Sequence, residues 1–134
     1  REFVPPSVWR RFGESSRWFL DPKMLDLAQF YRDFFGAPVY INTWPKYEGG
    51  HSERGFRLPD TSTGASLSQH KFGRAFDCDI KGYTPDGARQ VIMDNEQEFM
   101  SAGLTTLESG DIATSWVHSD IRTTNYSHIL IVSP

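Results

Sequence analysis

Two periods of apolar residues run through the chain, and each predicts a type of secondary structure. After Asp21 and Pro22, apolar residues recur at helical spacing as far as Phe34, and Gly36 follows. Asp is a favoured N-cap, Pro is tolerated at the first helical position, and Gly commonly terminates a helix. The pattern predicts a helix that begins at Pro22, ends at Gly36 and turns a wide apolar stripe toward the core.

The same signals predict a second helix, with Thr84 as its cap, Pro85 in its first turn and Gly103 beyond its end. Its inner face is formed by Ala88, Val91, Ile92, Asn95 and Phe99. The first twenty residues contain several aromatic side chains. We interpret residues 1–20 as an N-terminal arm that packs on the domain as a structural strap.

Five runs of β-branched and aromatic residues are typical of strands. They cover Val39–Trp44, Arg74–Ile80, Leu104–Glu108, Ser115–Arg122 and His128–Val132. Turn-rich segments join the last three runs, so antiparallel pairing is expected there. Together the elements predict an α+β fold in which helices pack on one side of a small, mostly antiparallel sheet.

The composition bounds the size and class of the protein. A chain of 134 residues suits one domain, and no repeat or long linker divides residues 1–134. A net charge of −3 argues against sequence-independent binding of nucleic acid, which needs a basic surface. No apolar run approaches the roughly 18 residues of a membrane span. The single cysteine, Cys78, excludes an internal disulfide and a CxxC zinc site. A monomer is expected.

Residues 68–77 and 115–120 carry the candidate chemistry. They contain His70, Asp77 and His118. Two imidazoles and one carboxylate are a standard ligand set for Zn²⁺, and three protein ligands leave a fourth position for water, as catalytic zinc sites require. The ligand set therefore favours a catalytic metal site over a structural one. For either segment alone, the alternative interpretation is a buried histidine that is hydrogen-bonded to a carboxylate.

The residues between these ligands suit the same interpretation. Gly73 permits a turn between the first histidine and the following strand. Ala75 shares a strand face with Asp77, and its small side chain leaves room beside a metal. Trp116 and Asp120 share a strand face with the second histidine, so Trp116 is expected to form a wall of the pocket.

The first segment, Ser68-x-His70-x-x-Gly73-x-Ala75-x-Asp77, resembles the SxHxxGxAxD motif of the M15 zinc peptidases, the group of D-alanyl-D-alanine carboxypeptidases and related endopeptidases. The second, Trp116-Val117-His118-Ser119-Asp120, is similar to the later WxHxD-type element of that family. The resemblance covers roughly residues 39–131 and is nearest to the short phage-type members. It implies a hedgehog/D-Ala-D-Ala-peptidase-like fold, with Zn²⁺ bound by His70, Asp77 and His118. The implied substrate is a peptidoglycan stem peptide, cut at a bond that involves a D-amino acid.

The general base is less clearly indicated than the ligands. Several members of the family have an acidic residue three positions before the last histidine ligand, and here that position is Ser115. Asp120 is the first candidate to replace it and Glu108 the second, with Asp111 in the intervening turn as a third. Asp120 is equally well interpreted as a group that orients a ligand histidine.

Other polar and aromatic residues are candidates for substrate contacts. The resemblance implies an arginine upstream of the first motif that holds a substrate carboxylate, and Arg57 is preferred over Arg54. Ser68 and Trp116 are the other expected substrate contacts. His51 is interpreted as a surface histidine, His128 as a structural one and Cys78 as a buried core residue. Asp79 is either a neighbour of the ligands or a rival of Asp77 as ligand. Trp44 and Tyr47 either line the substrate groove or belong to the core.

Three functional hypotheses follow from these residues. The first is a zinc-dependent peptidase that acts on the bacterial cell wall, as a carboxypeptidase or an endopeptidase. The second is an inactive zinc-bearing module that binds wall peptides or belongs to a phage particle, and Ser115 favours it. The third is a metal-free structural domain.

Overall fold

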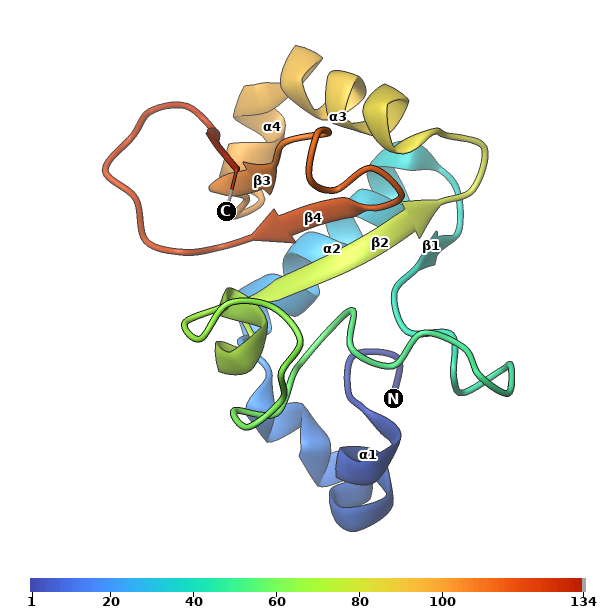
Figure 1. Cartoon of the computed structure of the whole chain (residues 1–134). Helices are drawn as coiled ribbons and strands as arrows, with labels where there is room; N and C mark the ends of the chain where they lie inside the picture. Colours follow the sequence, from blue (N-terminus) through green and yellow to red (C-terminus); the bar gives the residue numbers. More distant parts are fainter. Residues whose placement is uncertain (134) are drawn as a thin grey trace.

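A computed structural model describes residues 1–133, and it contains a five-stranded sheet with helices (Figure 1). The helices are α1 (Pro6–Phe12), α2 (Pro22–Phe35), α3 (Pro85–Asp94) and α4 (Glu96–Ser101), with 3₁₀ helices η1 (Gly13–Phe19) and η2 (Gln69–Phe72). The strands are β1 (Val39–Tyr40), β2 (Ala75–Ile80), β3 (Thr106–Glu108), β4 (Val117–Asp120) and β5 (Leu130–Val132). The expected α+β class is confirmed.

The signals at the ends of α2 act as the sequence predicts. The carboxylate of Asp21 accepts a hydrogen bond from the amide of Lys23 at 3.0 Å, and Pro22 occupies the first turn. Gly36 ends the helix with φ 58° and ψ 26°, a left-handed conformation that is inexpensive only for glycine. The second predicted helix is instead divided at Asn95 into α3 and α4, because Asn95 leaves the helical conformation.

The strands follow the order β1-β2-β4-β3-β5. The first three neighbouring pairs are antiparallel, but β5 pairs with β3 in parallel, so the antiparallel prediction is wrong for β5. The chain leaves β4, returns through residues 121–129 and runs beside β3 in the same direction (Figure 1). The predicted first strand is shorter than expected, because the backbone amides of Asn42 and Thr43 bond Glu2 and His51 instead of a strand.

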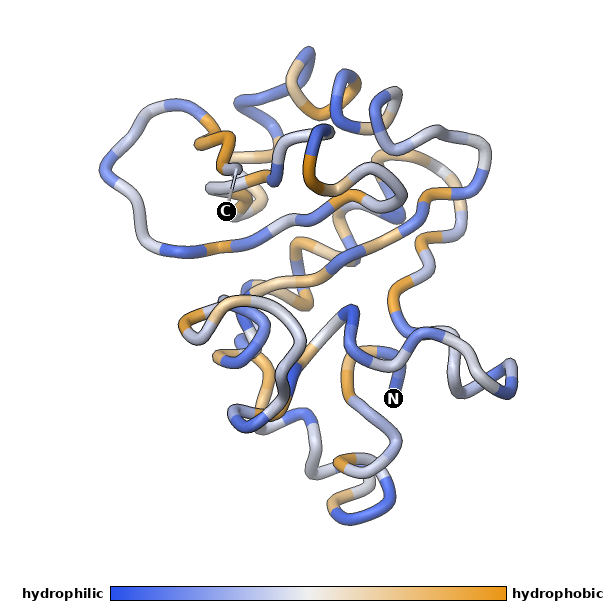
Figure 2. Tube along the Cα trace, viewed as in Figure 1, coloured by the Kyte–Doolittle hydropathy of each residue, from blue (hydrophilic) through white to orange (hydrophobic). Residues whose placement is uncertain are grey.

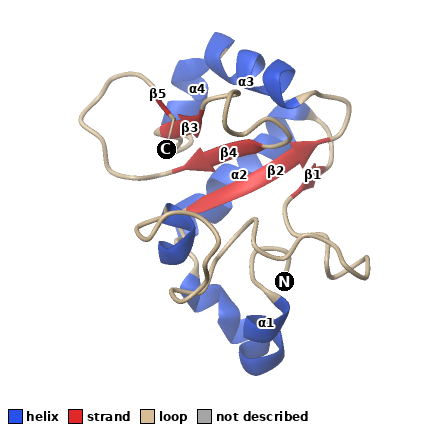
Figure 3. Ribbon diagram, in the orientation of Figure 1, coloured by secondary structure: helices blue, strands red, loops and turns tan. Residues whose placement is uncertain are grey.

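The two faces of the sheet have different surroundings. Phe76 and Cys78 of β2 belong to one core cluster with α2, α3 and α4, and α2 lies behind the sheet in Figure 3. The apolar segments drawn orange in Figure 2 gather in this region, whereas the loop of residues 45–64 is mostly polar. Alternation along β2 turns Asp77 to the opposite face. The loop runs beside β2 at this point, where the carbonyl of Arg54 accepts a 2.7 Å hydrogen bond from the backbone amide of Asp77.

The N-terminal segment forms α1 and η1 and packs against the loop that follows β1. The carbonyl of Phe3 accepts a 2.7 Å hydrogen bond from the amide of Phe56, and the carbonyl of Val4 accepts one from the indole of Trp44 at 2.9 Å. At Gly55 the backbone passes so close to Phe3 that a Cβ atom would lie 2.3 Å from its carbonyl oxygen. These contacts tie the N-terminal segment to the loop that runs beside β2.

Within residues 1–133, no helix is both long and apolar enough to cross a lipid bilayer.

Candidate metal centre

Strand register brings together residues that are far apart in the sequence. β2 and β4 pair so that Asp77 lies directly opposite His118. β3 pairs with the other edge of β4, with Thr106 opposite Asp120 and Leu107 opposite Ser119. Continuing that register brings Glu108 beside His118. Asp77, His118 and Glu108 thus form one row across three adjacent strands.

A second histidine, His70, lies next to Asp77 and His118 and comes from η2, the short helix that precedes β2. Gly73 ends this short helix with φ 66°, and its amide donates to the carbonyls of Gln69 and His70. A Cβ atom at Gly73 would lie 2.0 Å from the carbonyl oxygen of Phe19. A glycine is therefore required both for the left-handed turn and for the close approach of the N-terminal segment. This turn folds His70 back over the start of β2.

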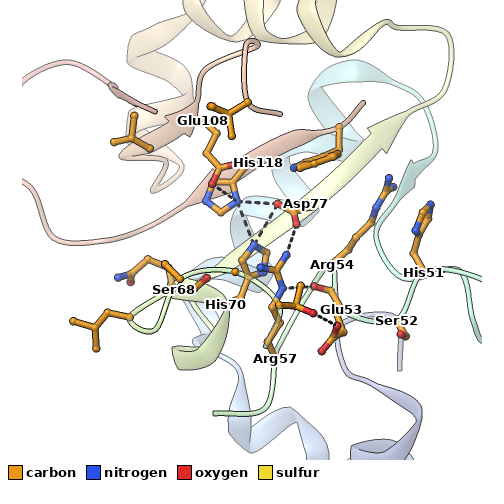
Figure 4. A pocket seen from close by; sticks show the side chains of 18 of the residues that line it. His51, Ser52, Glu53, Arg54, Arg57, Ser68, His70, Asp77, Glu108 and His118 are labelled. Carbon is orange, nitrogen blue, oxygen red and sulfur yellow. Dashed lines mark hydrogen bonds and ion pairs between the residues drawn. The ribbon is translucent and has the colours of Figure 1, made fainter. Parts of the chain in front are cut away.

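His70, Asp77 and His118 converge at the centre of this face (Figure 4). Nδ1 of His118 lies 2.8 Å from Oδ1 of Asp77 and 3.2 Å from Nε2 of His70. The same Oδ1 lies 3.2 Å from Nε2 of His70. All three residues are buried, with 1% of His70 and 4% of Asp77 and His118 exposed.

Each histidine makes one hydrogen bond on the side away from the other two residues of the group. These hydrogen bonds fix which ring nitrogen presents a lone pair to the group. Nδ1 of His70 contacts the carbonyl of Gly55 at 2.7 Å, and Nε2 of His118 contacts the carboxylate of Asp120 at 3.2 Å. Both partners only accept, so these nitrogens carry hydrogen. In neutral rings the other nitrogens present lone pairs to each other and to Asp77. Three such atoms this close require a cation or a proton between them.

The distances fit a tetrahedral zinc ion. Around such an ion, with bonds of about 2.0–2.1 Å, neighbouring ligand atoms lie roughly 3.3 Å apart, and the three separations here are 2.8, 3.2 and 3.2 Å. The nitrogen and oxygen donors also suit zinc chemically. His70, Asp77 and His118 therefore form a group that could hold a metal ion, and their remaining side opens to a pocket.

The charges around His118 change its protonation. Burial lowers the pKa of this imidazole, but its hydrogen bonds to Asp120 and Asp77 and the negative charges of Asp77 and Glu108 outweigh burial and raise the pKa to about 9. Burial raises the pKa of the Asp77 carboxyl, but the two histidines hold it far below its usual range. With no metal bound, a proton on His118 therefore takes the place of the cation.

The two candidate bases lie on opposite sides of His118. Asp120 is completely buried and contacts Nε2, the nitrogen that faces away from the ligand group. Its carboxylate also accepts hydrogen bonds from the guanidinium of Arg122, at 2.9 Å from Nε and 2.5 Å from Nη2. Burial raises the pKa of Asp120, but the hydrogen bonds from His118 and Arg122 hold it below its ordinary value. This geometry favours the orienting interpretation of Asp120.

Glu108 faces the open side of the group. Its Oε1 lies 3.9 Å from Nδ1 of His118, the nitrogen that points at the ligand centre. Its side chain is 19% exposed and lines the pocket. Figure 4 shows it directed toward His118 and Asp77. Asp111, the third candidate, is not among the pocket-lining residues in the part of the chain that the structure describes.

The pocket beside the group has a volume of about 960 Å³. Ser68 and Trp116, two expected substrate contacts, line it, as do His51 and Arg54. Arg57 also lines it, but its Nη2 donates to Oδ2 of Asp77 at 2.7 Å and its Nε donates to the carbonyl of Glu53 at 2.6 Å. The structure thus places Arg57 as a partner of Asp77, one of the three candidate ligands.

The other residues considered from the sequence lie outside the ligand group. Asp79 pairs with Arg54 at 2.5 Å, Cys78 is buried in the core, and His128 stacks near Tyr126. Trp44 donates to the carbonyl of Val4 and Tyr47 is largely exposed. These placements leave only His70, Asp77 and His118 at the centre of the described site.

Arg122 is a charged pocket residue, in contact with Asp120, that the sequence did not single out. Its spacing of two from Asp120 places both residues on one face of an extended strand, and that alternation was the only signal that could have identified it.

Comparison of the chain with protein-family models, with curated proteins and with solved structures gives no match. The assignment of a function therefore depends on the chemistry and the geometry of this site.

Proposed function

We propose that this protein is a zinc-dependent peptidase that hydrolyses peptidoglycan stem peptides at a bond involving a D-amino acid. The observation that carries the proposal is the convergence of three lone-pair atoms, from His70, Asp77 and His118, beside a large pocket. Three protein ligands and an open side are typical of catalytic zinc sites. The substrate class follows from the resemblance of residues 68–77 and 116–120 to the M15 motifs.

In this proposal, zinc supplies Lewis acidity, which lowers the pKa of a water to about 7 and polarises the scissile carbonyl. The chain's own residues supply the proton transfer. Glu108 has a carboxylate on the open side of the ligand group, 3.9 Å from Nδ1 of His118. Such a group can take the proton of the attacking water and deliver it to the leaving amine.

The neighbouring charged residues position this machinery. Arg57 occupies Oδ2 of Asp77, so only Oδ1 of that carboxylate faces the centre. Asp120 holds the imidazole of His118 from behind, and Arg122 holds Asp120. Outer partners of this kind fix the tautomer and the orientation of metal ligands.

A second candidate function is a zinc-bearing module that binds wall peptides without cutting them. Ser115 favours it, because this position, three before His118, carries no acid. In the peptidase proposal, Glu108 supplies the acidic group that is missing at Ser115. The peptidase and the binding module therefore differ in whether Glu108 transfers a proton.

Digestion of purified peptidoglycan by the full chain tests the proposal. Elemental analysis should give about one zinc per chain, as one tetrahedral site requires. Soluble peptide fragments should appear, disappear with a chelator and return with added zinc. The variant Asp77→Asn, which removes the ligand charge, should release none. One bound zinc with no fragments would support the binding module, and absence of zinc would contradict both functions.

A further inference from the structure

The pocket extends to both sides of the ligand group. In Figure 4, Ser68 lies on one side and His51 and Arg54 lie on the other, with the ligand group between them. The volume of about 960 Å³ is at the upper end of the range of roughly 300–1,000 Å³ for small-ligand pockets. A substrate peptide whose scissile bond lies at the ligand group could therefore extend into the pocket on both sides of that bond.

Each arginine that lines the described pocket is already paired with an aspartate. Nη2 of Arg57 lies 2.7 Å from Asp77, and Nη1 of Arg54 lies 2.5 Å from Asp79. Arg122 approaches Asp120 through Nε and Nη2, with Nη2 at 2.5 Å. In the Arg57–Asp77 pair the two side chains are 12% and 6% exposed, so solvent does little to weaken it. In the Arg54–Asp79 pair the guanidinium is 12% exposed, but the carboxylate is 45% exposed.

The described lining of the pocket contains no positively charged side chain without a carboxylate partner. Among residues 1–133 its lining includes three arginines and no lysine, against the carboxylates of Glu53, Asp77 and Glu108. The aspartates behind Arg54 and Arg122 raise the number of carboxylates to five. A bound divalent cation would balance the excess of two negative charges. A further carboxylate entering the pocket would then meet no unmatched positive charge.

Enzymes that remove a terminal residue need a cationic group for the terminal carboxylate, and a guanidinium grips one with paired hydrogen bonds. On the basis of the proposed function, we infer that this site is that of an endopeptidase. Such an enzyme cuts an internal bond of the stem peptide, and the site has no subsite for a free carboxyl terminus. The pairing of Arg54, Arg57 and Arg122 with aspartates carries this inference.

Two synthetic stem pentapeptides test it, one with a free carboxyl terminus and one with a terminal amide, each incubated with the zinc-loaded full chain. Fragments of two or more residues are expected from both, at rates within about threefold of each other. Release of a single residue from the carboxyl terminus, slowed more than about tenfold by the amide, would overturn the inference. The same result would support the proposed peptidase function. Failure to cut either pentapeptide or peptidoglycan would overturn the proposed function and this inference together.

A variant that frees one guanidinium gives a second test. Asp79 is 45% exposed, so Asp79→Asn should fold while leaving Arg54 without its partner. We expect the rate on the free-acid peptide, relative to the amide, to rise several-fold. The exposed Asp60, changed to Asn, is the matched control and should keep the wild-type ratio. An unchanged ratio in Asp79→Asn would overturn the claim that pairing excludes the carboxylate.

Discussion

At the scale of single residues, Glu108 and Asp120 approach opposite nitrogens of His118, and this separates their expected roles. Glu108→Gln should retain zinc and lower hydrolysis by about 10²–10⁴-fold, because the proposed general base is lost from the open side of the site. Asp120→Asn should weaken zinc binding by about 10–100-fold, because the imidazole loses its orienting carboxylate. Zinc affinity and turnover at saturating zinc distinguish the two.

The reverse result for this pair would contradict the assignment. If Asp120→Asn lost turnover with its zinc affinity intact, while Glu108→Gln remained active, Asp120 would be the base. Asp111→Asn serves as the control, since this exposed acid lies outside the pocket in the described chain and should behave like the wild type.

The raised pKa of His118 predicts how zinc affinity depends on pH. With no metal bound, this imidazole keeps its proton up to a pH of about 9, and zinc must displace that proton. Apparent affinity should therefore rise by about tenfold per pH unit below 9 and level off above it. Competition with a chelating dye between pH 6.5 and 9.5 measures the slope.

Asp120→Asn provides the control for this pH dependence. Among the influences that raise the pKa of His118, the hydrogen bond that it donates to Asp120 ranks first, so its loss should move the start of the plateau to lower pH. A flat affinity over the whole range in the wild type would mean that no proton competes with the metal.

The sequence predicts the three candidate ligands better than it predicts their neighbours. His70, Asp77 and His118 stand out by residue type and spacing, because zinc restricts both. The row that joins Asp77, His118 and Glu108 depends on the pairing of β3 with β4. Pairing register is a property of distant segments, so alternation within one strand could not show that Glu108 faces the site and Asp120 faces away.

At the scale of elements, local signals predict helix starts well, and long-range contacts decide the rest. The caps of α2 and α3 are formed by Asp21 and Thr84, whose side chains accept hydrogen bonds from nearby amides. The parallel pairing of β5 with β3 depends on the path of residues 121–129, which no local pattern fixes. The division of the second helix at Asn95 was likewise not visible from its apolar face.

The turn at Gly73 connects the N-terminal segment to the ligand group, and a substitution there tests that connection. Gly73→Ala places a Cβ atom 2.0 Å from the carbonyl of Phe19, so the turn that carries His70 must shift. We expect a loss of more than about 2 kcal/mol of unfolding free energy, from strain and steric conflict, and weaker zinc binding. Urea unfolding and zinc titration measure the two effects.

Gly36→Ala is the matched control for this turn. Gly36 has a similar φ of 58°, against 66° at Gly73, but a Cβ atom there meets nothing within 4 Å. The control should lose only about 1–2 kcal/mol from backbone strain and should bind zinc normally. Equal effects of the two substitutions on zinc binding would disprove the steric link between Gly73 and His70.

At the scale of the whole molecule, the candidate ligands join three separate segments. His70 belongs to η2, Asp77 to β2 and His118 to β4. The Gly55 carbonyl behind His70 belongs to a loop that the N-terminal strap holds through Phe3. A bound cation would therefore cross-link the sheet to this loop and, through it, to the N-terminal segment.

Removal of this cation is expected to lower the melting temperature of the full chain. A ligand that binds only the folded state stabilises it by about 2.7 kcal/mol at 100 times its Kd. For a chain of this length each kcal/mol shifts Tm by roughly 3–5 °C, so excess chelator should lower Tm by about 10 °C. Scanning calorimetry of the wild type and of His118→Gln measures the effect. His118→Gln has an incomplete ligand set and should melt at a temperature that chelator leaves unchanged. If the wild-type Tm is equally insensitive to chelator, no cation ties these segments together.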